Sequence, residues 1–238
     1  MPLTALLAKK QIAEGTMAFY FRKPPDFHYV AGQFVDMTIP NPPETDAEGN
    51  TRAFSLASAS HEKDLMIATR MRDTAFKRVL AKMEPGTEVE ISEPMGSFVL
   101  HKNPAKGAVF LMGGIGITPA FSIVKCAAEH KLPHQLVMFY SNKRPEDAPF
   151  LDELTAVSQQ NPNFKLVTTM TEMQNSAKPW TGETGLITDE LVKKHVDPSK
   201  DAIWYLSGPP GMVKAMRKLL LSMNVDEDNF RTEEFSGY

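Results

Sequence analysis

The chain has 238 residues and, at 42% hydrophobic and 23% charged, the composition of a globular protein with one large domain or two modest ones. Its net charge of −3 gives no basic footprint for nucleic acid or a membrane surface, and no apolar run is long enough to cross a bilayer. The single cysteine, Cys126, excludes an intramolecular disulfide and a cluster held by four thiolates of this chain.

The sequence shows neither a secretory signal nor a recognisable metal-binding motif. In the first ten residues the lysines follow the apolar residues, the reverse of a secretory signal, which favours a cytoplasmic location. The six histidines show no metal-ligand spacing with acids nearby, so we expect no metal site and interpret them as surface or capping residues. Neither a Walker loop nor a G-x-S-x-G elbow is present in the sequence.

The first part of the chain, to about residue 101, is predicted to be rich in short β-strands. Turn signals separate the five expected strands, which are residues 16–23, 33–40, 51–59, 64–71 and 87–94. Residues 74–83 interrupt them with apolar side chains at helical spacing, and the Pro-rich, acidic stretch 41–50 is predicted to be a surface loop. Many short strands with one helix predict an antiparallel β-barrel of the Greek-key type over residues 1–101.

From residue 108 the pattern changes to apolar strands that alternate with amphipathic helices. Helices are expected at 118–130, 150–160, 188–195 and 211–223. Because the strands between them are apolar on both faces, residues 107–238 are predicted to form a doubly wound, Rossmann-like α/β domain with a parallel sheet. Ligands of such domains bind beyond the carboxyl ends of the strands, and the last strand delivers the tail, residues 231–238, to that edge.

Two motifs have the residue types of cofactor sites. GGIGITP (113–119) closes the first parallel strand and opens a helix, where glycines let a pyrophosphate approach the free N–H groups. A tight strand-to-helix turn is an equally good explanation of that run alone. In TRAFSLASA (51–59), Arg52 is a candidate phosphate ligand and shares a strand face with Phe54, although an ordinary strand with a surface arginine also fits.

Taken in order, the motifs of the whole chain resemble those of the ferredoxin–NADP reductase family. RAFS followed by LAS resembles the R-x-[YF]-S flavin motif of that family. Four further segments resemble family elements, namely ATRMRDTAFKRVL (68–80), EPMGSF (93–98), GGIGITP (113–119) and YLSGPPGM (205–212). The resemblance implies a flavin-binding barrel followed by an NAD(P)-binding α/β domain, in a form without an iron–sulfur domain.

The resemblance implies an FAD site in the barrel, completed by the tail. Its expected residues are Arg52, Ala53, Phe54, Ser55, Thr69, Arg70, Met71, Thr74, Ala75, Phe76, Lys77, Phe235 and Tyr238. Arg52 would bind the pyrophosphate, Phe54 and Phe235 would cover the two faces of the isoalloxazine, and Ser55 would hydrogen-bond flavin N5. Tyr238 would reach the adenine. The sequence departs from the family pattern at Lys77, which stands near the usual serine.

An NAD(P) site is implied at the strand ends of the second domain. Its expected residues are Gly113, Gly114, Gly116, Thr118, Ser141, Asn142, Lys143, Arg144, Ser207, Gly208, Pro209 and Met212. Ser207 departs from the family, which often has cysteine there, and Glu93 departs at a turn glycine. The side chains expected at the reacting centre are those of Ser55, Ser207, Glu233 and Phe235. Lys143 and Arg144 precede the nearby acids, which favours NADPH over NADH, whereas a solvated loop is the alternative.

The implied function is hydride transfer between NAD(P)H and flavin N5, with electrons passing to a separate ferredoxin or flavodoxin. The sequence cluster Arg70, Arg72, Lys77 and Arg78 favours an acidic protein acceptor. Three alternatives stay open: a reductase of free flavin or ferric chelates, a reductase subunit of a larger electron-transfer complex, and a nucleotide-binding module without flavin.

Overall fold

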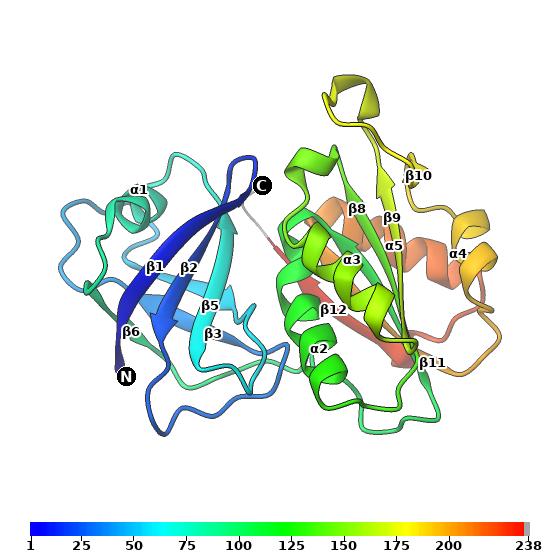
Figure 1. Ribbon diagram of the computed structural model, residues 1–238, viewed down its shortest axis with the longest axis horizontal. Coiled ribbons are helices and arrows are strands. Elements are labelled where there is room, and N and C mark those ends of the chain that lie inside the picture. Colours follow the sequence, from blue (N-terminus) through cyan, green and yellow to red (C-terminus); the bar gives the residue numbers. More distant parts are fainter. Residues whose placement is uncertain (236–238) are drawn as a thin grey trace.

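Two six-stranded sheets, each with its own helices, make up the computed structural model, which describes residues 1–235 (Figure 1). The first sheet has the order β4-β3-β6-β1-β2-β5, and all its strand pairs are antiparallel. Its strands are β1 (Leu3–Ala13), β2 (Thr16–Arg22), β3 (Phe34–Thr38), β4 (Thr51–Ser55), β5 (Asp64–Arg70) and β6 (Glu88–Ile91). A bridge between Leu56 and Ile67 joins the two edges and closes the sheet into a barrel.

The expected helix and all five expected strands of this half are present, and the helix α1 (Ala75–Lys82) buries the apolar face that the spacing predicts. The longest strand, β1, is not predicted by the sequence pattern. Its sequence LTALLAKKQIA consists mainly of residues with good helix propensity. Pairing with β2 on one side and β6 on the other overrides that local preference.

The second sheet is parallel throughout, in the order β10-β9-β8-β7-β11-β12. Its strands are β7 (Gly107–Gly113), β8 (Leu136–Asn142), β9 (Phe164–Met170), β10 (Glu183–Thr184), β11 (Ala202–Gly208) and β12 (Phe230–Glu234). Within this sheet, the chain enters at β7, continues through β8 and β9 to the edge strand β10, and then crosses back to β11 on the other side of β7. The strand order therefore reverses between β7 and β11, which is where ligands of doubly wound domains bind.

Helices cover both faces of the parallel sheet, as expected from its unalternating apolar strands (Figure 1). The helices are α2 (Ile117–Glu129), α3 (Leu151–Gln160), α4 (Asp189–His195) and α5 (Pro210–Ser222). Alternate residues of β7 belong to the two resulting cores: Phe110 packs with α2 and α3, and Leu111 packs with α4 and α5. The predicted fold class is confirmed.

The two halves share one apolar core rather than being joined by a linker alone. Ala18 and Ala68 of the barrel lie in the same buried cluster as Phe121 of α2 and Phe150 before α3. These small barrel side chains let the two halves approach closely. The position of the barrel relative to the carboxyl edge of the parallel sheet is thereby set by packing.

Candidate active site

The first βα turn lies at the point where the strand order reverses. Gly114 has a φ of +52°, and Gly114–Gly116 form a short 3₁₀ turn that runs directly into α2. A Cβ on Gly116 would lie 2.5 Å from the backbone nitrogen of Gly208, so the turn packs against the end of β11. Thr118 is buried, and its hydroxyl donates to the carbonyl of Ile115 at 3.1 Å, which makes it a stabiliser of the turn.

The neighbouring end of β11 is equally close-packed. A Cβ on Gly113 would meet the sulfur of Met212 at 2.2 Å and Pro209 at 3.3 Å. Gly208 has a φ of +156°, and its carbonyl accepts a hydrogen bond from the N–H of Phe235. Six of the predicted nucleotide residues thus lie together, namely Gly113, Gly116, Ser207, Gly208, Pro209 and Met212.

Buried polar atoms without hydrogen-bond partners gather at the carboxyl ends of three strands. Among the described residues they include both amide atoms of Asn142 on β8, Oγ of Ser207 on β11 and Oε2 of Glu233 on β12. Ser207 and Glu233 are paired residues of adjacent parallel strands, so their side chains face the same way. Buried polar groups are normally satisfied, and a group of unsatisfied ones at a strand edge fits a site that a polar ligand completes.

A hydrogen bond connects the barrel to this edge. The hydroxyl of Ser55, at the end of β4, donates to Oε1 of Glu233 at 2.8 Å across 178 residues of sequence. Burial raises the pKa of Glu233 to about 7, although the hydrogen bond from Ser55 acts to lower it. Near neutral pH this carboxyl is therefore able either to hold a proton or to release one.

The predicted aromatic residues occupy two different cores. Phe54 is buried in the barrel core, with its ring centroid 5.8 Å from that of Phe76. Phe235 is partly buried and packs against the core shared by the two halves, so the two rings are not in one cluster. Tyr238, predicted to reach the adenine, lies outside the described residues.

Arg52 and the N-terminus of α1 together bind a carboxylate side chain of the same chain. Arg52 lies over the ring of Phe76, on the face it shares with Phe54. Its guanidinium donates to the carboxylate of Asp46 at 3.0 Å and also pairs with Glu48. The second oxygen of Asp46 accepts from the backbone N–H of Ala75 at 3.2 Å, in the first turn of α1. Arginine and helix N-terminus together thus form an anion cradle, which here binds a carboxylate.

Asp46 is a residue that the sequence does not single out. It lies in the acidic loop 41–50, for which the sequence predicts only a surface loop. Thr74 caps α1 by accepting from the N–H of Lys77, whose own ammonium donates to the carbonyl of Arg70 at 2.8 Å. Burial, with the nearby charges of Arg72 and Arg52, lowers the pKa of Lys77. Lys77 therefore ties α1 to the end of β5 through the Arg70 carbonyl.

The remaining predicted flavin residues line the end of β5 and the middle of β4. Thr69 is buried, and the N–H of Met71 donates to the carbonyl of Gly15. The guanidinium of Arg70 crosses to the other half and donates to the carbonyl of Asp147 at 3.2 Å. Ala53 is exposed on β4.

The basic residues after β8 are both paired with acids. Lys143 forms an ion pair with Glu172 at 3.0 Å, and Arg144 binds both Asp147 and Glu14 at 2.8 Å. Arg144 thereby ties the second half to the turn between β1 and β2. These carboxylates partly neutralise both cations, which reduces the positive charge available to a 2′-phosphate.

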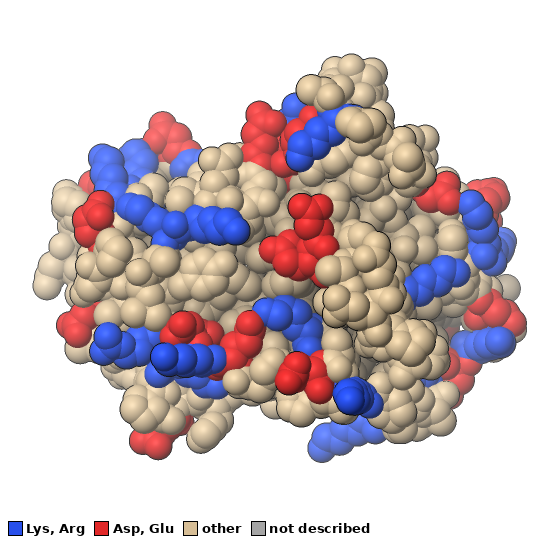
Figure 2. Space-filling view, in the orientation of Figure 1, with Lys and Arg blue, Asp and Glu red and all other residues tan. Residues whose placement is uncertain are grey.

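Three of the four residues in the predicted basic cluster are engaged by other groups, and the fourth, Arg72, is exposed. Arg78 pairs with Glu44 and Asp73, both at 2.5 Å, while Arg70 and Lys77 donate to backbone carbonyls. On the face drawn in Figure 2, several basic side chains lie next to one another at the upper left, and acidic side chains gather near the middle of the view.

A cleft of about 450 Å³ opens elsewhere between the halves, lined by Tyr20, Met66, Phe121, Phe150 and Glu153 among others. No predicted site residue within 1–235 lines it, so it is separate from the site of Ser55 and Glu233.

Among residues 1–235, no helix is both long enough and apolar enough to cross a membrane.

Comparison with known proteins agrees with this geometry. Residues 110–218 match the model of the oxidoreductase NAD-binding domain. The chain is 25% identical over 225 residues to the glycine betaine monooxygenase reductase subunit of Chromohalobacter salexigens, covering 93% of this chain and 60% of that protein. It is 28% identical over 232 residues to an NADH-cytochrome b5 reductase 1 of Lodderomyces elongisporus, covering 93% and 74%.

Solved structures share the fold over nearly the whole chain. A ferredoxin NADP⁺ reductase from Neisseria gonorrhoeae with bound FAD and NADP superposes with a TM-score of 0.80 at 24% identity, covering 98% of both chains. This chain spans about half to three fifths of the length of several curated relatives. The domain match thus identifies an oxidoreductase NAD-binding domain in the second half, and the whole chain has the two-sheet fold of the ferredoxin NADP⁺ reductase.

Proposed function

We propose that this protein is an FAD-dependent NAD(P)H oxidoreductase that passes electrons to a separate acceptor. The observation that carries the proposal is the hydrogen bond between Ser55 and Glu233, which joins the barrel to the strand edge where unpartnered polar atoms gather. When bound, FAD would accept two electrons together from the nucleotide and could release them one at a time. The protein would contribute position, exclusion of water and control of a proton.

The residues fit these roles. The cradle of Arg52 and α1 already binds one anion, which supports pyrophosphate binding there. The hydroxyl of Ser55 and the carboxyl of Glu233, whose pKa is near neutral, would lie at the flavin edge, and their mutual hydrogen bond supports this role. On the nucleotide side, the turn at Gly113–Gly116 would hold the pyrophosphate, and the free hydroxyl of Ser207 would orient the nicotinamide.

The acceptor we propose is a protein. Two relatives are named as reductase parts of oxygenases, the glycine betaine monooxygenase reductase subunit and the reductase component of propane 2-monooxygenase from Mycolicibacterium smegmatis. Ferredoxin and flavodoxin remain the first acceptors to test. A preference for NADPH over NADH remains a prediction from Lys143 and Arg144, reduced in weight by their ion pairs.

The function is tested by anaerobic reduction. The purified protein, loaded with FAD, is mixed with NADPH or NADH, and bleaching of the flavin absorbance is followed. Ferredoxin, flavodoxin, free flavin and a ferric chelate are then added separately. We expect bleaching by at least one nucleotide and faster reoxidation by a protein than by small acceptors. Protein that takes up no FAD would rule out the redox function, and fastest transfer to a ferric chelate would favour the small-acceptor alternative.

A separate prediction concerns the anion in the cradle. Because the carboxylate of Asp46 occupies both Arg52 and the N–H of Ala75, it competes with the proposed pyrophosphate. Replacing Asp46 with asparagine removes the charge, and we expect FAD to bind about two- to five-fold more tightly. The measurement is quenching of flavin fluorescence during titration of the apoprotein.

The matched control is Glu48→Gln. Glu48 also pairs with Arg52, but its side chain is 76% exposed, and the hydrogen bond from the N–H of Ala75 goes to Asp46 instead. Its neutralisation should change FAD affinity less than that of Asp46. Equal effects of the two variants would mean that general charge, rather than occupation of the cradle, sets the affinity. Weaker binding by Asp46→Asn would show that Asp46 positions Arg52 for the cofactor.

A further inference from the structure

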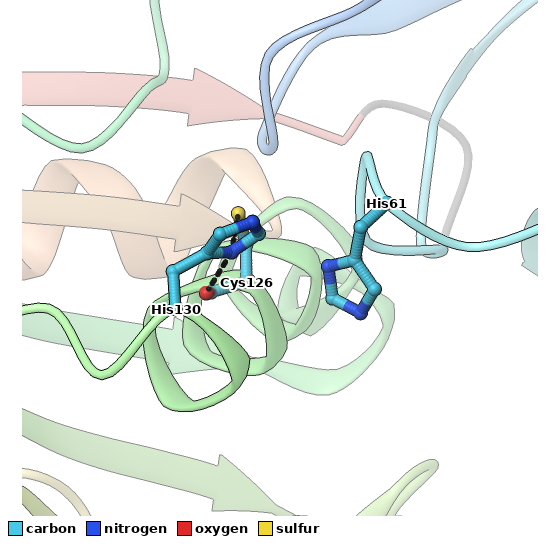
Figure 3. Close-up of side chains that lie close together, drawn as sticks. All are labelled: His61, Cys126 and His130. Carbon is cyan, nitrogen blue, oxygen red and sulfur yellow. Dashed lines mark hydrogen bonds between the residues drawn. The ribbon is translucent and has the colours of Figure 1, made fainter.

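Three potential metal ligands from different halves of the molecule lie together, and none of them is a predicted cofactor residue (Figure 3). His61 is on the loop between β4 and β5, whereas Cys126 and His130 are one turn apart at the end of α2. One ligating atom of each residue lies within 4.8 Å of those of the other two. The two imidazole rings meet edge to face, with centroids 5.2 Å apart.

We propose that His61, Cys126 and His130 bind a transition-metal ion of the zinc type. Sγ of Cys126 and Nδ1 of His130 are 3.6 Å apart. Two such ligands on one tetrahedral Zn²⁺ ion are separated by about the same distance, given its usual bond lengths to sulfur and nitrogen. A thiolate and two imidazoles form a donor set that zinc prefers over calcium or magnesium.

The loop carrying His61 is already held on α2 without an ion. Ser122 of α2 donates to the carbonyl of Ser58, and Lys125 pairs with Glu62, each at 2.5 Å. The hydroxyl of Ser60 lies 3.7 Å from Sγ of Cys126. These contacts flank the three ligands on both elements, so an ion would enter an arrangement that requires little ordering of backbone.

The side chains can adjust and remain open to solvent. His61 and His130 are exposed and Cys126 is half-buried, so an ion can reach them and water can fill the fourth position. Nδ1 of His130 now lies 2.9 Å from the carbonyl of Cys126. Coordination through this nitrogen would replace that hydrogen bond with one from water. The thiol of Cys126 would release its proton to solvent as its sulfur binds the metal.

A bound ion would cross-link the barrel to the nucleotide-binding half. Zn²⁺ should therefore raise the melting temperature by binding only the folded arrangement of all three ligands. The sequence predicts no metal site when histidines are required to lie at ligand spacing with acidic residues nearby. Cys126 and His130 form a Cys-x₃-His pair on one helix, which that criterion does not detect. His61 is 65 residues distant from Cys126 and is added only by the packing of the two halves.

The test is metal titration of the reduced protein. Zn²⁺ binding is measured by calorimetry, and Co²⁺ is used as a spectroscopic probe because a thiolate ligand gives a charge-transfer band. We expect one ion per chain, a charge-transfer band, and a higher melting temperature with Zn²⁺. Each of His61→Ala, Cys126→Ser and His130→Ala should weaken Zn²⁺ binding by more than about 100-fold, because loss of a direct ligand exceeds the usual effect of an outer-shell change. Circular dichroism verifies that each variant is folded.

The matched control is His28→Ala, which removes an exposed histidine outside the cluster. It should bind Zn²⁺ like the unaltered protein. Unchanged affinity in His61→Ala would overturn the cross-linking site, even if the helix pair still bound metal. Equal weakening by His28→Ala, or absence of the charge-transfer band, would also overturn it. These readouts need neither FAD nor NAD(P)H, so they are independent of the proposed redox function.

Discussion

Replacing Gly116 with alanine is expected to lower the free energy of unfolding by about 3 kcal/mol and to weaken NAD(P)H binding at least about ten-fold. The backbone of Gly116 has a φ of −60° and a ψ of −5°, which alanine adopts easily. The obstacle is purely one of space. The added Cβ would lie 2.5 Å and 2.6 Å from the nitrogen and Cα of Gly208 and 2.7 Å from the carbonyl carbon of Ser207. Because these are backbone atoms, they can yield only if the first βα turn moves away from β11.

Alanine substitutions at two other glycines should destabilise the protein less than the substitution at Gly116. At Gly113 the closest obstacle is the flexible side chain of Met212, so alanine there should destabilise the protein less than at Gly116. At Gly211, within α5, no atom of residues 1–235 beyond its chain neighbours and the helix backbone lies within 4 Å of the added Cβ. Alanine at Gly211 should be neutral or stabilising by roughly 0.5–1 kcal/mol. Urea unfolding and nucleotide titration of the three variants measure this order, and a Gly116→Ala protein of normal stability would contradict it.

Much of the fold could be predicted from sequence because its signals are local. The apolar run of β7 and the glycines that follow it predict a buried parallel strand and a βα turn from neighbouring residues alone. β1 could not be predicted in this way, since its helix-forming residues become a strand only through pairing with β2 and β6. Propensity is a weak guide where tertiary pairing decides.

The candidate site also contains residues that the sequence predicts and contacts that it does not. Arg52 and Gly116 belong to short motifs and could be selected from sequence. The capture of Arg52 by Asp46 depends on how an irregular loop folds back, for which the sequence carries no periodic signal. The contact between Ser55 and Glu233 joins the two halves, and only family resemblance draws attention to Glu233. The roles of the predicted residues in binding cofactors remain predictions until the variants are measured.

Glu233 is expected to make the protein less stable as the pH rises from about 4.5 to 7. Burial raises the pKa of this carboxyl to about 7 in the folded protein, from 4.5 when it is free. Between those values the folded state keeps a proton that the unfolded state has lost, so each rise in pH favours unfolding. Above pH 7 both states are ionised and no further loss occurs. The full effect of the group is about 3 kcal/mol.

Replacing Glu233 with glutamine should remove this dependence. Glutamine keeps a carbonyl oxygen that can accept from Ser55, but it cannot ionise. Relative to the unaltered protein, the Glu233→Gln variant should gain about 2.5 kcal/mol of stability between pH 5 and pH 8, because part of the full effect is already present at pH 5. Urea unfolding at both pH values measures the difference, in which the titration of all other groups cancels. The matched control is Glu234→Gln, an exposed carboxyl on the same strand, and it should show no such gain.

Ser55→Ala tests the cause as well as the size of the effect. The hydroxyl of Ser55 stabilises the ionised carboxylate and so lowers the pKa of Glu233, in opposition to burial. Without that hydroxyl the pKa should rise further, and the loss of stability should extend to a higher pH than in the unaltered protein. A shift to lower pH would mean that the Ser55 hydroxyl favours the protonated carboxyl instead. Because Ser55 and Glu233 come from different halves, a change in either direction would also demonstrate that the two halves form this contact in solution.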